Sequence, residues 1–186
     1  MVRLCSASET RAKILKEVGI EFIQCSGDFD EEALLEKYRR PESFVYHATK
    51  GKYDNCLQKF GLDLPLIVAD TVVSVDGEIL RKARNKEEAY RILRRQSGNR
   101  VTILTCTMYK SEKKEFVDLS ATHYVFDEFE EEDLKEYLES EEWIGKAGAC
   151  MVEGFCKKYI REVRGYESCA RGLTIEKLLP FMDIKK

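Results

Sequence analysis

The sequence predicts an α/β fold, with a mixed β-sheet flanked by helices in one domain that spans residues 1–186. Segments with the apolar pattern of strands alternate along the chain with segments of helical periodicity, which is typical of this class. No internal repeat, low-complexity tract or Pro/Gly-rich linker marks a domain boundary. A chain of 186 residues is also long enough to bury a substantial core.

The expected elements of the N-terminal part follow from apolar spacing and from the glycines that end helices. Asp70 directly follows the apolar run Leu64–Ala69, so we expect it where a buried strand ends. The Asp-Gly pair at Asp76 predicts a hairpin turn. In chain order we expect a strand at Val2–Cys5, a helix ending at Gly19, a strand at Glu21–Gln24, a loop or helix start at Gly27–Glu32, a helix at Val45–Phe60, a strand at Leu64–Ala69 and a hairpin at Val72–Leu80.

The C-terminal part continues the alternation of the two patterns. In chain order we expect a helix at Lys86–Gln96, an antiparallel strand pair at Val101–Tyr109 and Glu115–Phe126, a helix at Glu130–Leu138, a Gly-rich segment at Gly145–Cys150, a β region through Val163 and a helix at Leu173–Phe181. Trp143, Phe155 and Tyr159 have the spacing of core aromatics, although a partner surface would also suit them.

The charge balance limits the classes of partner. Lysine and arginine number 31 against 34 aspartate and glutamate, so the formal net charge is −3. Because no global basic field is present, we expect no nucleic-acid partner. A small anionic ligand would instead need a local cluster of cations.

The compartment is predicted from the N-terminus and the cysteines. The first residues reach charges too early for a signal peptide, and no later run has membrane-spanning length. We therefore expect a cytoplasmic protein with no membrane partner. The seven cysteines are scattered without a CxxC pair, as expected of reduced thiols. His47 and His123 have no recognisable thiol-protease context, which argues against a catalytic cysteine.

Two polar segments at predicted strand ends suit a ligand crevice, which in α/β sheets lies at such ends. Ser6 and Ser8 with Arg11 can hold and clamp a phosphate. The same residues are equally explained if Ser8 only caps a helix and Arg11 only lies on its solvated face. Asp70, followed by Thr71, is costly to bury unless it binds a cation or works as a base, although turn capping is the common explanation.

Two further segments fit the same crevice. Lys82 follows the predicted hairpin and could bridge phosphate oxygens, or it could simply be solvated. The glycines Gly145 and Gly148 permit either close backbone approach to a ligand or a tight turn.

Together these segments resemble the Maf family, and the resemblance covers almost the whole chain. Nine short motifs carry it: Leu4–Leu15, Asp28–Glu31, Gly51–Lys52, Ala69–Val73, Gly77–Lys82, Ser97–Gly98, Lys146–Ala149, Glu153–Gly154 and Gly172–Leu173. The family implies two lobes around a nucleotide cleft, a house-cleaning pyrophosphatase that cleaves standard or modified nucleoside triphosphates to monophosphate and pyrophosphate, and a homodimer. It also implies a divalent metal, Mg²⁺ or Mn²⁺. The alternative is a non-catalytic nucleotide-binding regulator of septum formation and cell division.

The resemblance assigns roles residue by residue. Asp70 matches the general base, and Glu31 with Asp70 matches the metal ligands. The neighbours Asp30 and Glu32 compete for the role of Glu31, and Lys50 competes with Lys52. Positions that match phosphate-binding residues are Ser6, Arg11, Lys52 and Lys82.

Three positions match those that select the base in the family: Thr10, Thr71 and Glu153. Thr71 resembles the branch that prefers thymidine and uridine triphosphates, whereas Glu153 resembles the 7-methylguanosine branch and Thr10 fits neither. Glu9-Thr10 and Ala83 stand where the family often has Pro-Arg and proline. The resemblance therefore predicts the phosphate chemistry without deciding the base.

Overall fold

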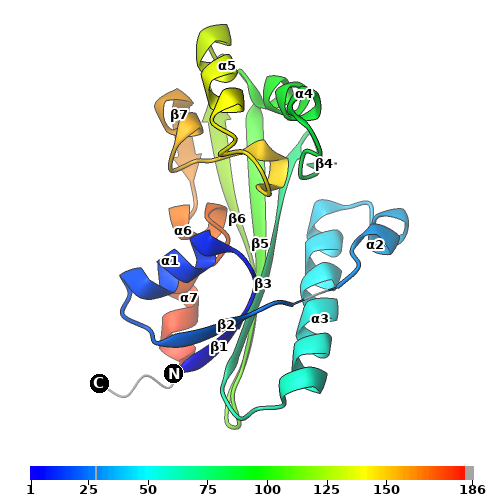
Figure 1. Cartoon of the computed structure of the whole chain (residues 1–186), viewed down its shortest axis with the longest axis vertical. Coiled ribbons are helices and arrows are strands. Elements are labelled where there is room, and N and C mark those ends of the chain that lie inside the picture. The colour runs from blue at the N-terminus through cyan, green and yellow to red at the C-terminus, as the bar shows by residue number, and fades with distance from the viewer. Residues whose placement is uncertain (28, 183–186) are drawn as a thin grey trace.

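The computed structural model describes residues 1–27 and 29–182, and its strands form one mixed sheet (Figure 1). Asp28 of the predicted motif lies outside the described residues. The strands are β1 (Val2–Cys5), β2 (Phe22–Cys25), β3 (Leu66–Val75), β4 (Glu78–Leu80), β5 (Arg100–Lys110), β6 (Glu115–Phe126) and β7 (Ile160–Arg164). The helices are α1 (Glu9–Glu17), α2 (Glu32–Lys37), α3 (Pro41–Phe60), α4 (Lys86–Gln96), α5 (Glu131–Glu139), α6 (Glu167–Ala170) and α7 (Ile175–Leu178), with 3₁₀ turns η1 (Ala147–Ala149), η2 (Phe155–Tyr159) and η3 (Leu179–Phe181).

The sheet has the strand order β2-β1-β3-β5-β6-β7, which confirms the predicted mixed α/β class. β1 is parallel to β2 and β3, whereas β3, β5, β6 and β7 pair antiparallel in succession. One edge of β3 pairs with β1 at Leu66 and Ile67 and with β4 from Val73 onward. Among the described residues, no strand pairs with 69–72 on that edge. This gap becomes the floor of the candidate site.

Helices cover both faces of the sheet, and the alternation along β3 decides which side chains meet them. Val68 and Val72 point to α3, where they pack with Val45 and Ala48. Ile67 lies on the other face, in a core shared with α1 and α7. The long strands β3, β5 and β6 extend beyond these helices to a second region formed by α4, α5 and β7 (Figure 1). The two lobes therefore share one continuous sheet.

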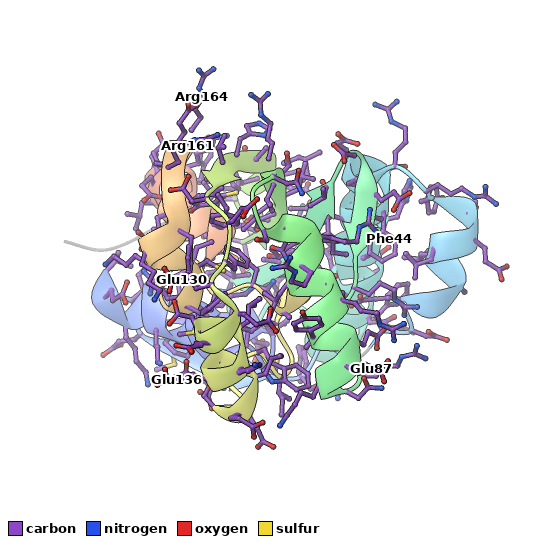
Figure 2. All side chains as sticks on the ribbon, turned by 90° about the horizontal axis from the view of Figure 1, so that it is seen from above. Phe44, Glu87, Glu130, Glu136, Arg161 and Arg164 are labelled. Atoms are coloured by element: carbon purple, nitrogen blue, oxygen red, sulfur yellow. The ribbon has the colours of Figure 1, made fainter. Side chains whose placement is uncertain are left out.

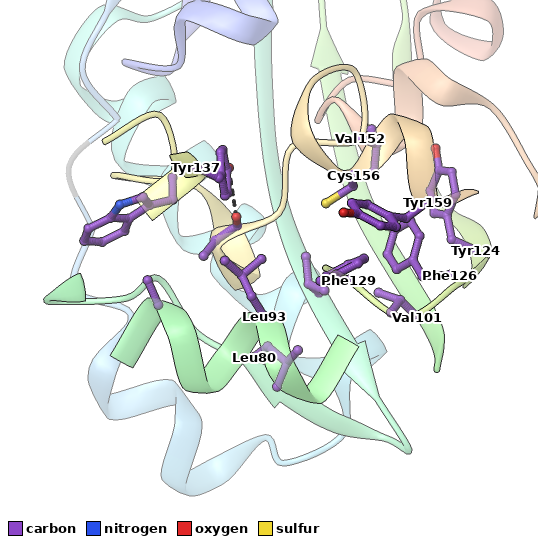
Figure 3. Close-up of a cluster of buried hydrophobic side chains, with 14 of the residues drawn as sticks. Leu80, Leu93, Val101, Tyr124, Phe126, Phe129, Tyr137, Val152, Cys156 and Tyr159 are labelled. Atoms are coloured by element: carbon purple, nitrogen blue, oxygen red, sulfur yellow. Dashed lines mark hydrogen bonds between the residues drawn. The ribbon is translucent and has the colours of Figure 1, made fainter. Parts of the chain in front are cut away.

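The second lobe has its own aromatic core (Figure 3). Leu93 of α4 and Leu134 of α5 are fully buried there, and Tyr137 donates a hydrogen bond from its hydroxyl to the carbonyl of Ala149 at 3.0 Å. Seen from above, α4 and α5 lie side by side with charged residues such as Glu87 and Glu136 on their outer surfaces (Figure 2). Each helix is thus amphipathic, with one apolar face in this core and a charged face outward.

Helix boundaries follow local capping chemistry. Ser8 accepts a hydrogen bond from the Arg11 amide and caps α1, while Asn85 accepts one from the Glu88 amide and caps α4. α3 begins at Pro41, earlier than predicted, because proline suits the first turn of a helix. No helix among the described residues has both the length and the apolar character needed to cross a membrane.

Two expectations about local structure were wrong, and one open alternative is decided. β3 runs without a break through Asp70, so this residue lies inside a strand and not at its end. The predicted β region after Cys150 is mostly turn, and only Ile160–Arg164 is a strand. Trp143 and Tyr159 are core residues, with 5% and 6% of their surface exposed.

The absence of a side chain at Gly148 lets the turn pack closely against β3, and not against a ligand. Gly148 has a φ of +60°, and a Cβ atom there would lie 2.8 Å from the Cβ of Val73 on β3. Its carbonyl accepts a hydrogen bond from the buried amide of Gln96 at 2.7 Å. Gly148 therefore fixes the turn η1 against the sheet, beside the candidate site.

We predict that Gly148→Ala lowers the free energy of unfolding by about 2–4 kcal/mol, because strain at positive φ adds to the clash with Val73. Gly145→Ala is the matched control, since Gly145 also has positive φ but a Cβ atom there would meet nothing within 4 Å. Denaturant unfolding measures both. Equal losses in the two variants would contradict the role given to the contact with Val73.

Candidate active site

A cleft of about 670 Å³ opens at the end of β1, along the unpaired edge of β3 between the two lobes. This volume suits a small organic ligand. All nine residues predicted for a site line this cleft: Ser6, Thr10, Arg11, Glu31, Lys52, Asp70, Thr71, Lys82 and Glu153. They come from both faces of the sheet and from both lobes.

Asp70 is the buried anion of the cleft, with 7% of its surface exposed. It lies on the α3 face of β3, where the Lys52 ammonium donates to its Oδ2 at 2.7 Å. The Thr71 amide donates to its Oδ1 at 2.9 Å. Both carboxylate oxygens are therefore held by donors, which fixes the orientation of the group.

Lys52 also contacts Glu31, so one ammonium joins two carboxylates. The competing lysine, Lys50, instead pairs with Asp54 on an exposed part of α3. Asp30 is exposed, whereas Glu31 lines the cleft. The geometry thus places Lys52 and Glu31, and not Lys50 or Asp30, beside Asp70.

The segment that carries Glu31 is seated on α3 by Phe29. A Cβ atom at Gly51 would lie 2.3 Å from the Phe29 ring, so the glycine before Lys52 leaves room for this ring against the helix. Both Phe29 and Glu31 line the cleft. The Gly51–Lys52 motif therefore positions two features at once, the ammonium and the loop that reaches it.

Arg11 approaches from the opposite face of the sheet. Its guanidinium donates to the Gly172 carbonyl at 2.7 Å, to Ser6 Oγ at 2.9 Å and to Thr71 Oγ1 at 3.0 Å. A Cβ atom at Gly172 would lie 3.1 Å from Arg11 Nε, so glycine permits this approach. Arg11 thereby joins the loop after β1 to the C-terminal segment.

The hydroxyl of Thr71 is part of a buried polar chain. It lies 2.8 Å from the hydroxyl of Thr105, its partner on β5, and Thr105 donates to the Cys169 carbonyl at 2.7 Å. Thr105 is fully buried behind the cleft. Thr105 could not be identified from the sequence, because a threonine inside a predicted strand carries no local sign of a ligand site.

The second lobe contributes cations and one carboxylate. Lys82 is exposed on the loop after β4, and no hydrogen bond or ion pair joins it to another described residue. Lys146 of this lobe also lines the cleft, and so does Arg171, which follows α6 and pairs with Glu17 of α1; the sequence pattern had suggested no role for either. Glu153 also lines the cleft. The pKa of Arg171 is raised chiefly by the hydrogen bonds that Arg171 donates to the Glu17 carboxylate, and the charge of Glu153 adds to this shift.

Opposing effects set the protonation state of Asp70. Burial alone would raise the pKa of Asp70, but the charges of Lys52 and Arg11, with the hydrogen bonds from Lys52 and the Thr71 amide, outweigh burial and lower it. The carboxylate is therefore ionised at neutral pH. Burial lowers the pKa of Arg11, while Asp70 and Glu31 oppose that shift, and arginine stays charged under such conditions.

The donor set of the cleft fits a hard divalent cation. Glu31 and Asp70 converge on one point, which the ammonium of Lys52 now occupies. Among the described residues, no three His, Cys, Asp or Glu side chains form a ready-made metal cage. Mg²⁺ commonly binds through one or two carboxylates and completes its shell with water and substrate phosphates.

We predict that Lys52→Met raises the pKa of Asp70, because the burial effect remains after the nearest positive charge is removed. The lowered pKa in the folded protein stabilises it above the ordinary carboxyl pKa, and this contribution is lost as pH falls through the folded value. NMR titration of the aspartate carboxyls in metal-free protein measures the shift. Lys50→Met is the control and should leave Asp70 unchanged; an equal shift in both variants would contradict the assignment.

Comparison with known proteins places the chain. A family model described as Maf-like protein matches residues 1–183. A nucleoside triphosphate pyrophosphatase of Nitratiruptor sp. is 58% identical over 178 residues, 96% of each chain. Proteins of the same name from Helicobacter pylori (strain Shi470) and Campylobacter jejuni are 40% and 36% identical, over 97% and 98% of this chain and 94% and 100% of theirs. The chain therefore belongs to the Maf family.

Proposed function

We propose that this protein is a nucleoside triphosphate pyrophosphatase, which hydrolyses its substrate between the α and β phosphates. The observation that carries the proposal is an ionised, oriented carboxylate, Asp70, in a cleft that three cationic side chains reach from different sides: Arg11, Lys52 and Lys82. The relatives named nucleoside triphosphate pyrophosphatase support the same activity.

In the proposed mechanism, Asp70 accepts a proton from the attacking water, and its lowered pKa keeps it ready to do so at neutral pH. Arg11 and Lys52 are already held near this carboxylate, so they can neutralise charge that develops on phosphate oxygens. Ser6, which accepts hydrogen bonds from Arg11 and the Ser8 amide, orients the loop at the end of β1. Lys82, exposed at the rim of the cleft, can meet the departing phosphates.

We propose Glu31 and Asp70 as the protein ligands of a divalent cation, Mg²⁺ or Mn²⁺. Such an ion, when bound, would supply Lewis-acid stabilisation of phosphate charge. Lys52 lies between the two carboxylates and offsets their mutual repulsion when no metal ion is bound. The oxygen chemistry of this pair supports a hard cation over a soft one.

A product analysis tests the proposed function. Purified protein with Mg²⁺ and a panel of nucleoside triphosphates should release monophosphate and pyrophosphate. Release of orthophosphate and nucleoside diphosphate would exclude this cleavage site. Binding without turnover, unchanged in Asp70→Asn, would instead support the non-catalytic alternative.

We predict that Asp70→Asn lowers kcat by about two to four orders of magnitude, the range for loss of a general base, while the fold is retained. Asparagine keeps the size of the side chain but cannot take the proton. Asp54→Asn, which alters an exposed ion pair on α3, is the control and should keep near-parental turnover. Near-parental turnover in Asp70→Asn would transfer the role of base, with Glu31 the next candidate.

We further propose that Thr10, Thr71 and Glu153 contact the base. Glu153 can accept hydrogen bonds from the N1 and N2 donors of guanine, whereas the carbonyls of uracil would be repelled by an ionised carboxylate. The positive charge of a 7-methylated guanine would be favoured too. Thr71 resembles the pyrimidine branch, so these two residues favour different bases.

We predict that Glu153→Gln lowers the ratio of guanine-type to pyrimidine triphosphate turnover, because the amide replaces one acceptor oxygen by a donor. Steady-state kcat/KM values for GTP, 7-methyl-GTP and UTP measure it. Glu162→Gln on the exposed strand β7 is the matched control. A ratio that stays constant in Glu153→Gln would remove this residue as a reader of the base.

We propose the cytoplasm as the compartment, supported by the seven cysteines, all of which are free thiols. In the pairs Cys5–Cys25 and Cys150–Cys156 the sulfurs lie 3.4 Å apart, in hydrogen-bond contact but without a disulfide bond. A homodimer stays a prediction from the family resemblance. Trp143 and Tyr159 lend it no support, since both are buried in the monomer.

A further inference from the structure

A line of hydroxyl groups runs from the wall of the cleft into the protein behind it. Thr71 lines the cleft, and Thr105 lies behind Thr71 with none of its surface exposed. The Cys169 carbonyl, which accepts a hydrogen bond from Thr105, is the last group of the line. The two threonines are direct partners on β3 and β5, with their hydroxyl oxygens 2.8 Å apart. The ladder between the strands holds this geometry.

Chemistry fixes the direction of every hydrogen bond in this line. The Cys169 carbonyl can only accept, so Thr105 must donate its one hydroxyl proton to it. Thr105 can therefore only accept from Thr71, which uses the one hydroxyl proton of Thr71. Arg11 can only donate, and it takes one lone pair of the Thr71 oxygen at 3.0 Å. Thr71 is left with one lone pair and no proton for a ligand.

We propose that Thr105 is a positioning residue for substrate choice, which fixes the Thr71 hydroxyl as a hydrogen-bond acceptor toward the nucleotide. This inference rests on the proposed function, because it assumes that a nucleotide fills the cleft. Thr105 is fully buried behind Thr71, so it would act on the substrate through Thr71 and not by contact. A group with its own lone pair facing Thr71 would find no proton there.

The consequence is a preference for bases with a ring N–H over those with a bare ring nitrogen. Uracil carries N3–H and hypoxanthine N1–H, whereas cytosine N3 and adenine N1 present a lone pair at the same ring position. The exocyclic amines of cytosine and adenine sit on the neighbouring carbon and do not replace that hydrogen. The unmodified protein should therefore favour UTP over CTP, and ITP over ATP.

Thr105→Val tests the inference, because it removes the acceptor that holds the Thr71 proton. The proton can then turn toward the ligand, so kcat/KM for CTP and ATP should rise relative to UTP and ITP. The UTP/CTP and ITP/ATP ratios should fall by about tenfold, the value of one hydrogen bond. Thr105→Ser restores the hydroxyl and should restore both ratios.

Thr122→Val is the matched control. Thr122 is equally buried on β6 and donates to the Tyr166 carbonyl at 2.7 Å, so its replacement removes the same kind of bond without contacting Thr71. It should lower stability comparably and leave the ratios unchanged. Thr71→Val, which removes the acceptor itself, should weaken UTP without improving CTP and serves if Thr105→Val does not fold.

Binding of the uncleavable α,β-methylene analogues of UTP and CTP, measured by calorimetry, separates this inference from the proposed reaction. A UTP-analogue preference that falls in Thr105→Val supports the inference even if no triphosphate is cleaved. Equal affinity of the unmodified protein for both analogues would overturn it. So would ratios that move equally in Thr105→Val and Thr122→Val, or that do not recover in Thr105→Ser.

Discussion

A buried negative charge inside a β-strand is the constraint on which the site depends. Asp70 lies within β3, where removal of water would cost several kcal/mol if the carboxylate were unpaired. Lys52 compensates it from the α3 face, and Arg11 contributes from the other face. The charge is therefore stabilised by groups on helices that cover both faces of the sheet. This ties the chemistry of the cleft to the packing of the N-terminal lobe.

Much of the fold could be predicted from the sequence because its helices have clear periodicity and caps, and its strands are apolar. The strand end expected at Asp70 was wrong for a physical reason. Aspartate is rare inside strands, but the full ladder of β3 with β5 and the cations of two distant segments override that local preference. Spacing along one chain does not show such compensation.

The residues of the candidate site could be predicted as a set, but the structure was needed to decide between neighbouring candidates and to find residues that act from behind the cleft. Lys50 and Lys52 are equivalent by sequence, and only the orientation of α3 sends Lys52 into the cleft. Gly148 fitted either a ligand contact or a turn, and its neighbour proves to be Val73. Thr105 could not be found from the sequence, because its role depends on hydrogen bonds with two groups distant in the chain, the Thr71 hydroxyl on β3 and the Cys169 carbonyl.

The continuous strands beneath both lobes have a mechanical consequence. β3 passes from its pairing with β1, along the cleft, to its pairing with β4, while β5 stays bonded to it along the whole length. A swinging motion of one lobe against the other would have to bend this ladder. The ladder therefore opposes changes in the width of the cleft, because a hinge between the lobes would have to deform paired strands and not a flexible linker.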